Sequence, residues 1–188
     1  MNRRKLIVTG LTLAAFATPL NAVWAGTEQA VTPEVSPPGD IPDDQVFITF
    51  KSPEGFLLKV PEGWSRKDDG KTTIFQDKYD RIAVTVSALT GTLDTDFAKQ
   101  TLVPEIQKGR AVKIGNISEV KLKGGAAIRI AYHENSDPNP VTSKQIRMES
   151  ERYYFAHAGK LVTLGLSAPM GADNVDQWKL ISSSFRWK

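Results

Sequence analysis

Residues 81–89 read Arg-Ile-Ala-Val-Thr-Val-Ser-Ala-Leu, and this stretch carries the clearest periodicity in the chain. Ile82, Val84 and Val86 alternate with polar residues such as Thr85. A period of two places the apolar side chains on one face of a strand. A strand with one buried and one solvated face is typical of antiparallel sheets. The stretch therefore predicts a one-sided antiparallel meander.

Turn residues and apolar runs on both sides of this stretch predict further strands. Proline, aspartate and glycine residues, which favour chain reversals, occur at 52–55, 61–64, 67–71 and 124–125. Each group separates two segments that are rich in apolar or β-branched residues, as strands are. The expected strands span residues 46–50, 56–60, 72–76, 117–122, 126–134, 145–156 and 161–167.

One segment in the middle of the chain has a helical period instead. Apolar residues from Phe97 to Ile106 follow the acids Asp94 and Asp96, and acids favour the start of a helix. We attribute this Asp-x-Asp pair to a helix cap rather than to a calcium site. Pro104 is expected to kink the helix or to restart it.

A second helix is expected near the C-terminus, capped by Asp173 or Asn174. Val175, Trp178 and Ile181 follow at three-residue steps and share one face of this helix. Together with the strands, the two helices predict an α+β domain over residues 46–188. Its expected architecture is a single, mostly antiparallel sheet with flanking helices.

The first 25 residues have the composition of a secretory signal peptide. Arg3, Arg4 and Lys5 precede an apolar run over residues 6–20, and cleavage is expected after Ala25. The run is shorter than the roughly 20 apolar residues of a bilayer span, so we expect no membrane span after cleavage. The adjacent arginines also fit a twin-arginine signal loosely, but we favour the general secretory route. The expected location is periplasmic or secreted.

Residues 26–45 hold four prolines and five acids but no basic residue. Such a composition cannot bury enough apolar surface to fold alone, so the segment is predicted to be an extended, flexible tether. The remainder, residues 46–188, carries 21 basic and 16 acidic residues. The tether could therefore fold back on the domain or serve only as a soluble spacer, and the sequence leaves both alternatives open.

The charge and cysteine content exclude several classes of function. The 188 residues include no cysteine, which excludes disulfides, thiolate metal sites, cysteine nucleophiles and a cysteine-linked lipid anchor. Three of the 24 basic residues and none of the 21 acids lie in the leader, so the rest of the chain is neutral. It lacks the basic footprint of a nucleic-acid-binding protein. It also lacks phosphate-binding and dinucleotide-binding glycine motifs, and we expect no cofactor and no metal.

Glu149 and Glu151 are candidate catalytic carboxylates, because they share one face of an expected strand about 7 Å apart. A symmetric reversal about the loop over 135–143 would place Arg129 opposite Glu151 and Arg147 beside His133. The basic neighbours favour a structural role for the two carboxylates on a solvated face.

The two histidines and Ser167 are the remaining candidates for chemistry. In the same register, Arg147 discourages His133 from binding a proton. His157 lies at the other end of the strand pair, on the order of tens of Å away, so the two imidazoles cannot share a metal. Ser167 lies in Gly-Leu-Ser-Ala-Pro, where proline replaces the second glycine of a nucleophile elbow. We therefore assign no catalytic residue.

Tryptophans follow the turn at 61–63 and the start of the C-terminal helix. Gly63 can take the positive φ that the turn needs. Trp64 would then cover the edge of the core, and we expect the same of Trp178 and Trp187 rather than a stacking platform for a ligand.

The motifs along residues 46–188 resemble those of the PsbP-like fold. They are Ser52-Pro53-Glu54-Gly55-Phe56, Val60-Pro61-Glu62-Gly63-Trp64 and the closing Trp178-x-x-Ile181-x-x-Ser184-Phe185. The fold is shared by the extrinsic photosystem II protein PsbP, a Ran-binding nuclear transport factor and LpqN-type bacterial envelope lipoproteins. The resemblance implies an antiparallel sheet flanked by helices and a non-catalytic accessory role in protein complexes. The lipoproteins carry a lipidated cysteine that this chain lacks, and no feature of the chain indicates photosynthesis.

We therefore expect an exported, soluble, non-catalytic accessory protein of the bacterial cell envelope. It would bind a protein partner or a small ligand, and not nucleic acid. Two alternatives stay open. One is an extracytoplasmic hydrolase that uses Glu149 and Glu151 or Ser167, and the other is a carrier of an apolar ligand. The sequence does not define the partner or the oligomeric state.

Overall fold

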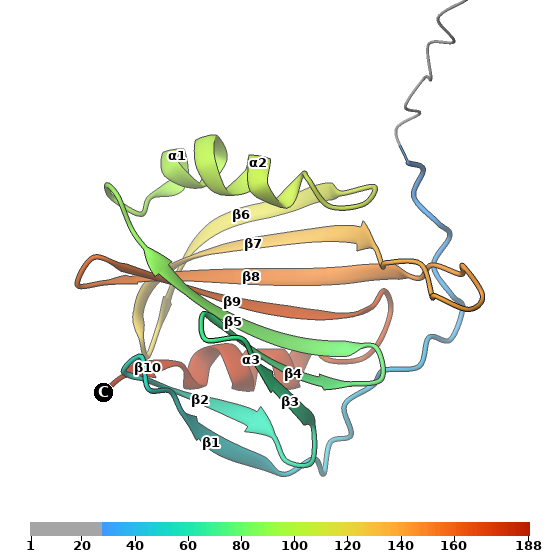
Figure 1. Ribbon diagram of the computed structural model, residues 1–188, viewed down its shortest axis with the longest axis horizontal. Helices are drawn as coiled ribbons and strands as arrows, with labels where there is room; N and C mark the ends of the chain where they lie inside the picture. The colour runs from blue at the N-terminus through green and yellow to red at the C-terminus, as the bar shows by residue number, and fades with distance from the viewer. Residues whose placement is uncertain (1–27) are drawn as a thin grey trace, which may run out of the picture.

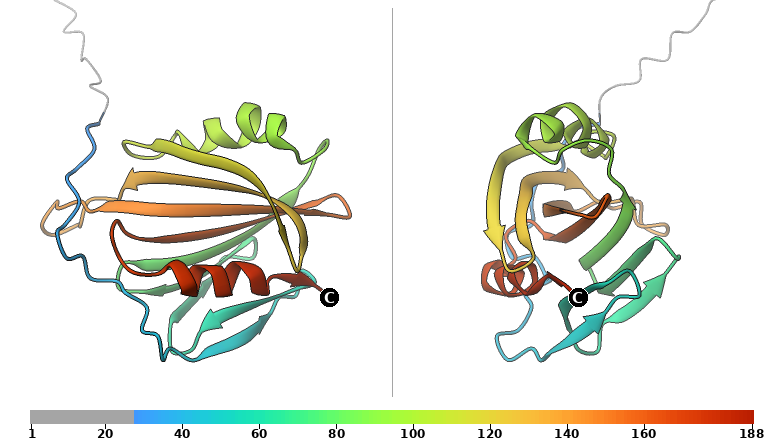
Figure 2. Two further views of the ribbon diagram at one scale, coloured as in Figure 1. Left: turned by 180° about the vertical axis from the view of Figure 1, so that it is seen from behind. Right: turned by 90° about the vertical axis from the view of Figure 1, so that its left-hand side faces the viewer.

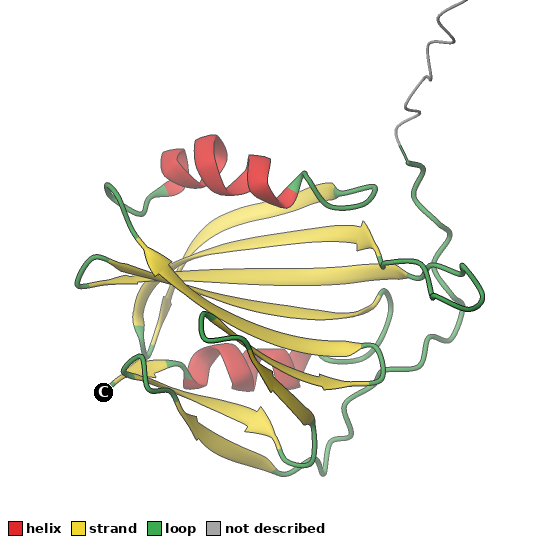
Figure 3. Ribbon diagram, viewed as in Figure 1, coloured by secondary structure: helices red, strands yellow, loops and turns green. Residues whose placement is uncertain are grey.

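The computed structural model describes residues 28–188, and the predicted leader lies outside these residues. Ten strands, three α-helices and one π-helix follow one another in this part of the chain (Figures 1 and 3). The strands are β1 (Phe47–Lys51), β2 (Phe56–Pro61), β3 (Ser65–Asp68), β4 (Thr72–Asp77), β5 (Asp80–Ala88), β6 (Lys113–Leu122), β7 (Gly125–Asn135), β8 (Arg147–His157), β9 (Lys160–Pro169) and β10 (Arg186–Trp187). The helical elements are α1 (Thr95–Phe97), the π-helix η1 (Ala98–Leu102), α2 (Val103–Ile106) and α3 (Val175–Ser184).

The strands form two antiparallel sheets. The large sheet has seven strands in the order β3-β4-β5-β9-β8-β7-β6, and the small sheet has three in the order β1-β2-β10. The predicted α+β class is confirmed, and each expected strand is present. The division into two sheets differs from the single sheet that we expected. It arises because β2 pairs with β1 and with the C-terminal β10, and not with the meander.

Strand β3 overlaps a stretch that the sequence predicted as a turn. All four of its residues are exposed, and it pairs only with β4 at the margin of the large sheet. An edge strand of this kind buries no apolar face, so it carries no alternation that a sequence pattern could reveal.

The large sheet packs against an apolar core on each of its faces. Successive residues of a strand point to opposite faces, and Tyr154 and Phe155 of β8 belong to different cores. The core around Phe155 includes Ile181 of α3 and the small sheet's Leu58. The core around Tyr154 includes Leu102 in the helical segment from α1 to α2. The two helical regions therefore lie on opposite faces of a curled sheet (Figure 2).

The helical segment from α1 to α2 begins and restarts as the sequence predicted. The Asp94 carboxylate accepts a hydrogen bond from the backbone N–H of Phe97 at 2.8 Å, which is an N-terminal cap. Pro104 lies in the first turn of α2, directly after the π-helical turn η1. Proline has no N–H to donate, so the change of hydrogen-bond pattern falls where that donor is missing.

The predicted tryptophan positions are confirmed. Gly63 has a φ of +85°, a conformation that favours glycine, and it forms the turn before Trp64. Trp64, Trp178 and Trp187 are partly buried and pack against the core that contains Phe155. Their position at the margin of the core gives them a structural role.

The segment over residues 28–45, which we call the strap, runs along the end of the large sheet where β7 ends and β8 begins (Figures 1 and 2). It contains no helix or strand, in keeping with its prolines. It is nevertheless bound to the domain by hydrogen bonds and ion pairs along much of its length. Of the two alternatives that the sequence left open for this segment, residues 28–45 adopt the first and fold back on the domain. No helix in residues 28–188 is long and apolar enough to cross a membrane.

Candidate binding site

A groove of about 710 Å³ lies beside the strap. Its walls come from the β4–β5 turn, the chain after α2 and the long β7–β8 loop. Four basic residues line it, against the two acids Glu134 and Asp137. The basic residues are Lys78, Arg81, Arg110 and Lys144. We call this cavity the basic groove, because its charge favours an anionic ligand.

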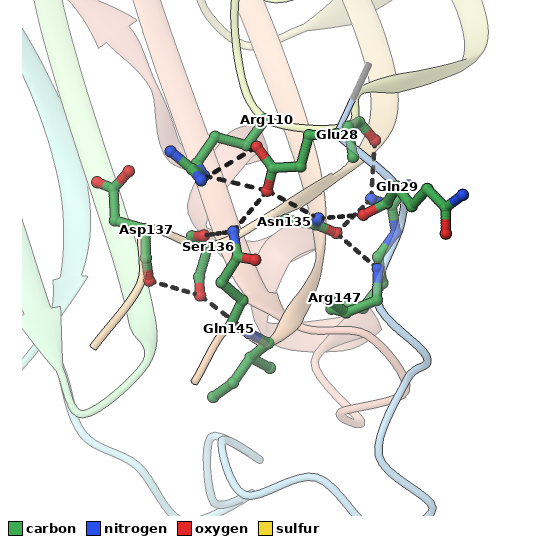
Figure 4. Close-up of polar contacts among 11 residues, drawn as sticks. Glu28, Gln29, Arg110, Asn135, Ser136, Asp137, Gln145 and Arg147 are labelled. Carbon is green, nitrogen blue, oxygen red and sulfur yellow. Dashed lines mark hydrogen bonds and ion pairs between the residues drawn. The ribbon is translucent and has the colours of Figure 1, made fainter. Parts of the chain in front are cut away.

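Carboxylates of the strap already bind two of the four basic side chains. Glu28 forms an ion pair with Arg110 at 3.1 Å, and Glu34 forms one with Lys144 at 2.6 Å. The Glu28 carboxylate also accepts hydrogen bonds from the side-chain amides of Gln145 and Asn135 (Figure 4). These amide hydrogen bonds, foremost that of Gln145, lower the pKa of Glu28, with a smaller contribution from Arg110. Glu28 is therefore ionised at neutral pH.

Asn135, at the end of β7, holds the main chain of the strap (Figure 4). Its Nδ2 donates to the carbonyl oxygen of Gln29 at 2.8 Å, and its Oδ1 accepts from the N–H of Val31 at 3.1 Å. Oδ1 also accepts from the guanidinium of Arg147 at 2.9 Å. Asn135 is 3% exposed, so its amide is oriented by buried neighbours rather than by solvent.

Asn174, directly before α3, holds the strap in the same way at a second place. Its Nδ2 donates to the carbonyl oxygen of Gly39 at 2.8 Å, and its Oδ1 accepts from the N–H of Ile41 at 2.7 Å. The sequence placed a helix cap at Asp173 or Asn174. Asn174 occupies that position, but its side chain makes no capping hydrogen bond to α3. The amide binds the strap instead, and its Oδ1 is occupied by the N–H of Ile41.

Asp80 is a buried carboxyl at this second contact. Nδ2 of Asn174 donates to its Oδ1 at 3.3 Å. Burial raises the pKa of Asp80 to about 7, and the negative charges of Asp77 and Asp40 act in the same direction. A Cβ on Gly39 would lie 3.1 Å from the Asp80 carboxylate, so the strap passes Asp80 at close range.

Glu149 and Glu151 lie on the face of the large sheet opposite the basic groove. They line a cavity of about 260 Å³ together with Arg129, Trp178 and Lys179. The predicted contact of Glu151 with Arg129 is confirmed, and the Arg129 Nε donates to it at 2.9 Å. Burial raises the pKa of Glu149.

The predicted register of β7 and β8 is wrong by two residues. His133 pairs with Glu149 and Arg129 pairs with Tyr153, so the Arg129–Glu151 contact is diagonal. A shift of two residues keeps every side chain on its predicted face. The error arises because the centre of the β7–β8 loop lies further along the chain than its prolines suggested. Arg147 is buried and donates to the carbonyl oxygen of Ala111 at 2.8 Å.

The two histidines do not meet. His157 stacks on Trp187 with ring centroids 4.8 Å apart, at the far end of β8 from the residues that face His133. Burial lowers the pKa of His133, and Arg147 and Lys113 lower it further. The predicted effect of Arg147 on His133 is therefore confirmed, with burial as the larger cause. No group of three or more His, Asp or Glu side chains in residues 28–188 is arranged to hold a metal.

Ser167 lines the basic groove, and neither histidine lies beside it. Its hydroxyl lies 2.8 Å from that of Ser150, which donates to Glu134 at 3.3 Å. His133 pairs with Glu149 and so points to the opposite face of the sheet. Ser167 is thus brought together neither with the histidines nor with the Glu149–Glu151 pair, whereas His133 lies opposite Glu149 on the other face.

Sequence reasoning missed Asn135 and Asn174 as binding residues. An isolated asparagine carries no spacing or periodicity, and Asn174 was interpreted only as a helix cap. The one available signal was the opposite charge of residues 26–45 and 46–188, which allowed the acidic segment to bind the domain.

No protein-family model matches the chain, and no curated protein sequence matches it. Solved structures do match. The solution structure of cyanobacterial PsbP (CyanoP) from Synechocystis sp. PCC 6803 has a TM-score of 0.54 and 17% sequence identity, over 80% of this chain and 98% of that one. The Ran-binding protein Mog1p of Saccharomyces cerevisiae has a TM-score of 0.50 and 10% identity, over 77% and 96% of the two chains.

LpqN of Mycobacterium tuberculosis, a protein involved in cell envelope biogenesis, covers 82% of this chain and 88% of its own at 16% identity. Its TM-score is 0.39. The likeness to CyanoP and Mog1p concerns the fold, because the identities are low. The chain has the PsbP-like fold, as its turn motifs and closing helix predicted.

Proposed function

We propose that this chain is an exported, non-catalytic accessory protein of the bacterial cell envelope, which binds a protein partner through the basic groove. The observation that carries the proposal is the strap itself. A stretch of polypeptide already lies at the groove, with Glu28 bound to Arg110 and Glu34 bound to Lys144. Two basic residues of the groove thus bind acidic polypeptide within the chain, and the groove has the charge to bind it from another chain.

Two further observations support a protein partner over an apolar ligand. The cavities described in residues 28–188 all have charged side chains in their linings, which does not favour an apolar ligand. Mog1p, which has the same fold, is a Ran-binding protein, so the fold can serve protein recognition. Export rests on the predicted leader with cleavage after Ala25, and a periplasmic or secreted location follows from it.

The proposal can be tested by capture of partners from the envelope fraction of the producing bacterium. We expect the Lys78→Glu and Arg81→Glu variants to lose the captured protein, since both residues line the groove and neither forms an ion pair within residues 28–188. Raised salt should weaken capture as well, because exposed charges are screened.

Lys179→Glu is the matched control, because Lys179 is exposed but lines the cavity on the opposite face. Its capture should equal that of the wild type. Equal capture by the groove variants and by this control would contradict the proposal.

A hydrolase remains the second candidate, and one observation favours it. Glu149 has a raised pKa, and it lies in a cavity with Trp178 and the ion-paired Glu151. Two neighbouring carboxyl groups in unlike surroundings, one buried and one paired with Arg129, suit acid–base chemistry. A broad panel of hydrolase substrates, assayed with Glu149→Gln, Glu151→Gln and Ser167→Ala, decides between the two. Activity that one variant abolishes without a change in melting temperature would establish the hydrolase.

A further inference from the structure

Asn135 and Asn174 bind the strap through the same pattern of main-chain groups. Each side-chain amide donates to the carbonyl oxygen of one strap residue and accepts from the N–H of the residue two further on. These groups lie on one edge of an extended chain, which a neighbouring strand would otherwise bind. The amides therefore recognise extended backbone, whatever side chains it carries. We call the two sites the Asn135 clamp and the Asn174 clamp.

The part of the strap at the Asn135 clamp contributes no fully buried side chain. No side chain from residue 28 to residue 40 is buried, and Ile41 is the first that is. The ion pairs of Glu28 and Glu34 involve partly exposed groups, and such pairs stabilise weakly. Hydrogen bonds that water can replace also contribute little net stability. Residues 28–34 can therefore leave the domain without exposing a core.

We propose that the Asn135 clamp and the basic groove form a docking site for an extended, acidic segment of a partner protein, which takes the place of strap residues 28–34. The strap remains anchored at Gly39 and Ile41 by the Asn174 clamp. The inference rests on the function proposed above and defines the kind of partner. In the isolated chain, the strap itself occupies this docking site.

The charges of the groove define the occupant. The strap brings carboxylates to Arg110 and Lys144, while Lys78 and Arg81 lie free of ion pairs within the described part of the chain. A segment that supplies acids to all four basic residues would bind better than the strap does. Such an advantage is necessary, because a tethered competitor has an effective concentration in the mM range.

The test uses a labelled synthetic peptide with the sequence of residues 28–38, and the full mature chain with a weakened strap. The strap is weakened by two substitutions. Glu28→Lys removes the ion pair with Arg110, and Val31→Pro removes the N–H that donates a hydrogen bond to Asn135. Fluorescence anisotropy should show the peptide binding to this variant at least about tenfold more tightly than to the wild type, where the strap competes.

Two altered peptides test whether the backbone is what the clamp binds. A peptide with Val31→Pro lacks the N–H that donates to Asn135, and it should bind about tenfold more weakly or worse. A peptide with Val35→Pro is the control, because no hydrogen bond of the Val35 N–H occurs in residues 28–188 and its side chain is fully exposed. The control peptide should bind as the unaltered one does.

The inference is overturned if the folded strap variant, checked by melting temperature and circular dichroism, binds no peptide. It is also overturned if the Val31→Pro peptide binds as tightly as the unaltered peptide. Either result leaves the proposed function intact when capture of the envelope partner still depends on Lys78 and Arg81. Loss of that dependence, in contrast, contradicts the proposed function itself.

Discussion

The Asn135 clamp and the Asn174 clamp bind the same main-chain groups at two places on one strap, and they differ in what surrounds them. Beside the Asn174 clamp, Ile41 inserts a side chain that is 4% exposed, and Asp80 is buried. Beside the Asn135 clamp, the strap contributes only exposed or half-exposed side chains, such as Glu28 and Val31.

The difference shows how one kind of contact can serve two purposes. Hydrogen bonds to backbone set the position of an extended chain but add little net stability. Burial of apolar surface supplies most of the free energy. The strap is therefore anchored where Ile41 is buried and exchangeable where it is not.

Ile41→Ala should have the largest effect, because it removes the one buried side chain of the strap. A truncation of this kind costs about 3 kcal/mol of unfolding free energy. In a domain of this size that lowers Tm by about 6–12 °C. Val35→Ala is the matched control, since Val35 is fully exposed, and its Tm should stay within about 2 °C of the wild type. Equal melting of the two variants would show that Ile41 anchors nothing.

Asn174→Ala should destabilise the protein more than Asn135→Ala. The first leaves the buried N–H of Ile41 unpaired, at a cost of about 2 kcal/mol, whereas water can reach the groups released by the second, at about 1 kcal/mol. Arg147 keeps its hydrogen bond to Ala111 in the Asn135 variant. Chemical denaturation of both variants measures the difference. The reverse order would mean that the two clamps have been assigned the wrong roles.

The sequence predicted the strands, turns and helices of the domain, but not the two asparagine clamps that bind the strap. Strand β5, the turn at Gly63 and the Asp94 cap follow from local chemistry, so alternation, glycine and an acid before a helix revealed them. The strap contacts join residues more than 100 positions apart through single asparagines. No local pattern marks such contacts, and a composition that predicts no core says nothing about main-chain hydrogen bonds.

The stability of the protein should depend on pH through Asp80. Its pKa is about 7 in the folded protein and near 3.8 in the unfolded chain, so the folded state binds more protons between these values. Its contribution is therefore most favourable at low pH and is lost as pH rises towards 7 and above. Tm should fall more steeply between pH 5 and pH 8 in the wild type than in Asp80→Asn. Asp44→Asn, in an exposed part of the strap, should retain the wild-type slope.

Glu28→Gln should have the smallest effect on stability. Glu28 is exposed, and exposed ion pairs contribute little to the free energy of unfolding. Thermal melting should therefore hardly change, while the N–H of Val31 should exchange with solvent faster. A substantial loss of Tm would show that the Asn135 clamp is as structural as the Asn174 clamp.

Hydrogen exchange at two backbone amides tests the contrast most directly. The N–H groups of Val31 and Ile41 both donate to an asparagine Oδ1, at 3.1 and 2.7 Å. We predict that the N–H of Ile41 exchanges only through large openings. Its free energy of opening should be close to that of global unfolding. Val31 should exchange about a hundredfold faster or more, through local release that low denaturant does not promote. Equal protection of the two amides, with the same response to denaturant, would contradict an exchangeable strap at the Asn135 clamp.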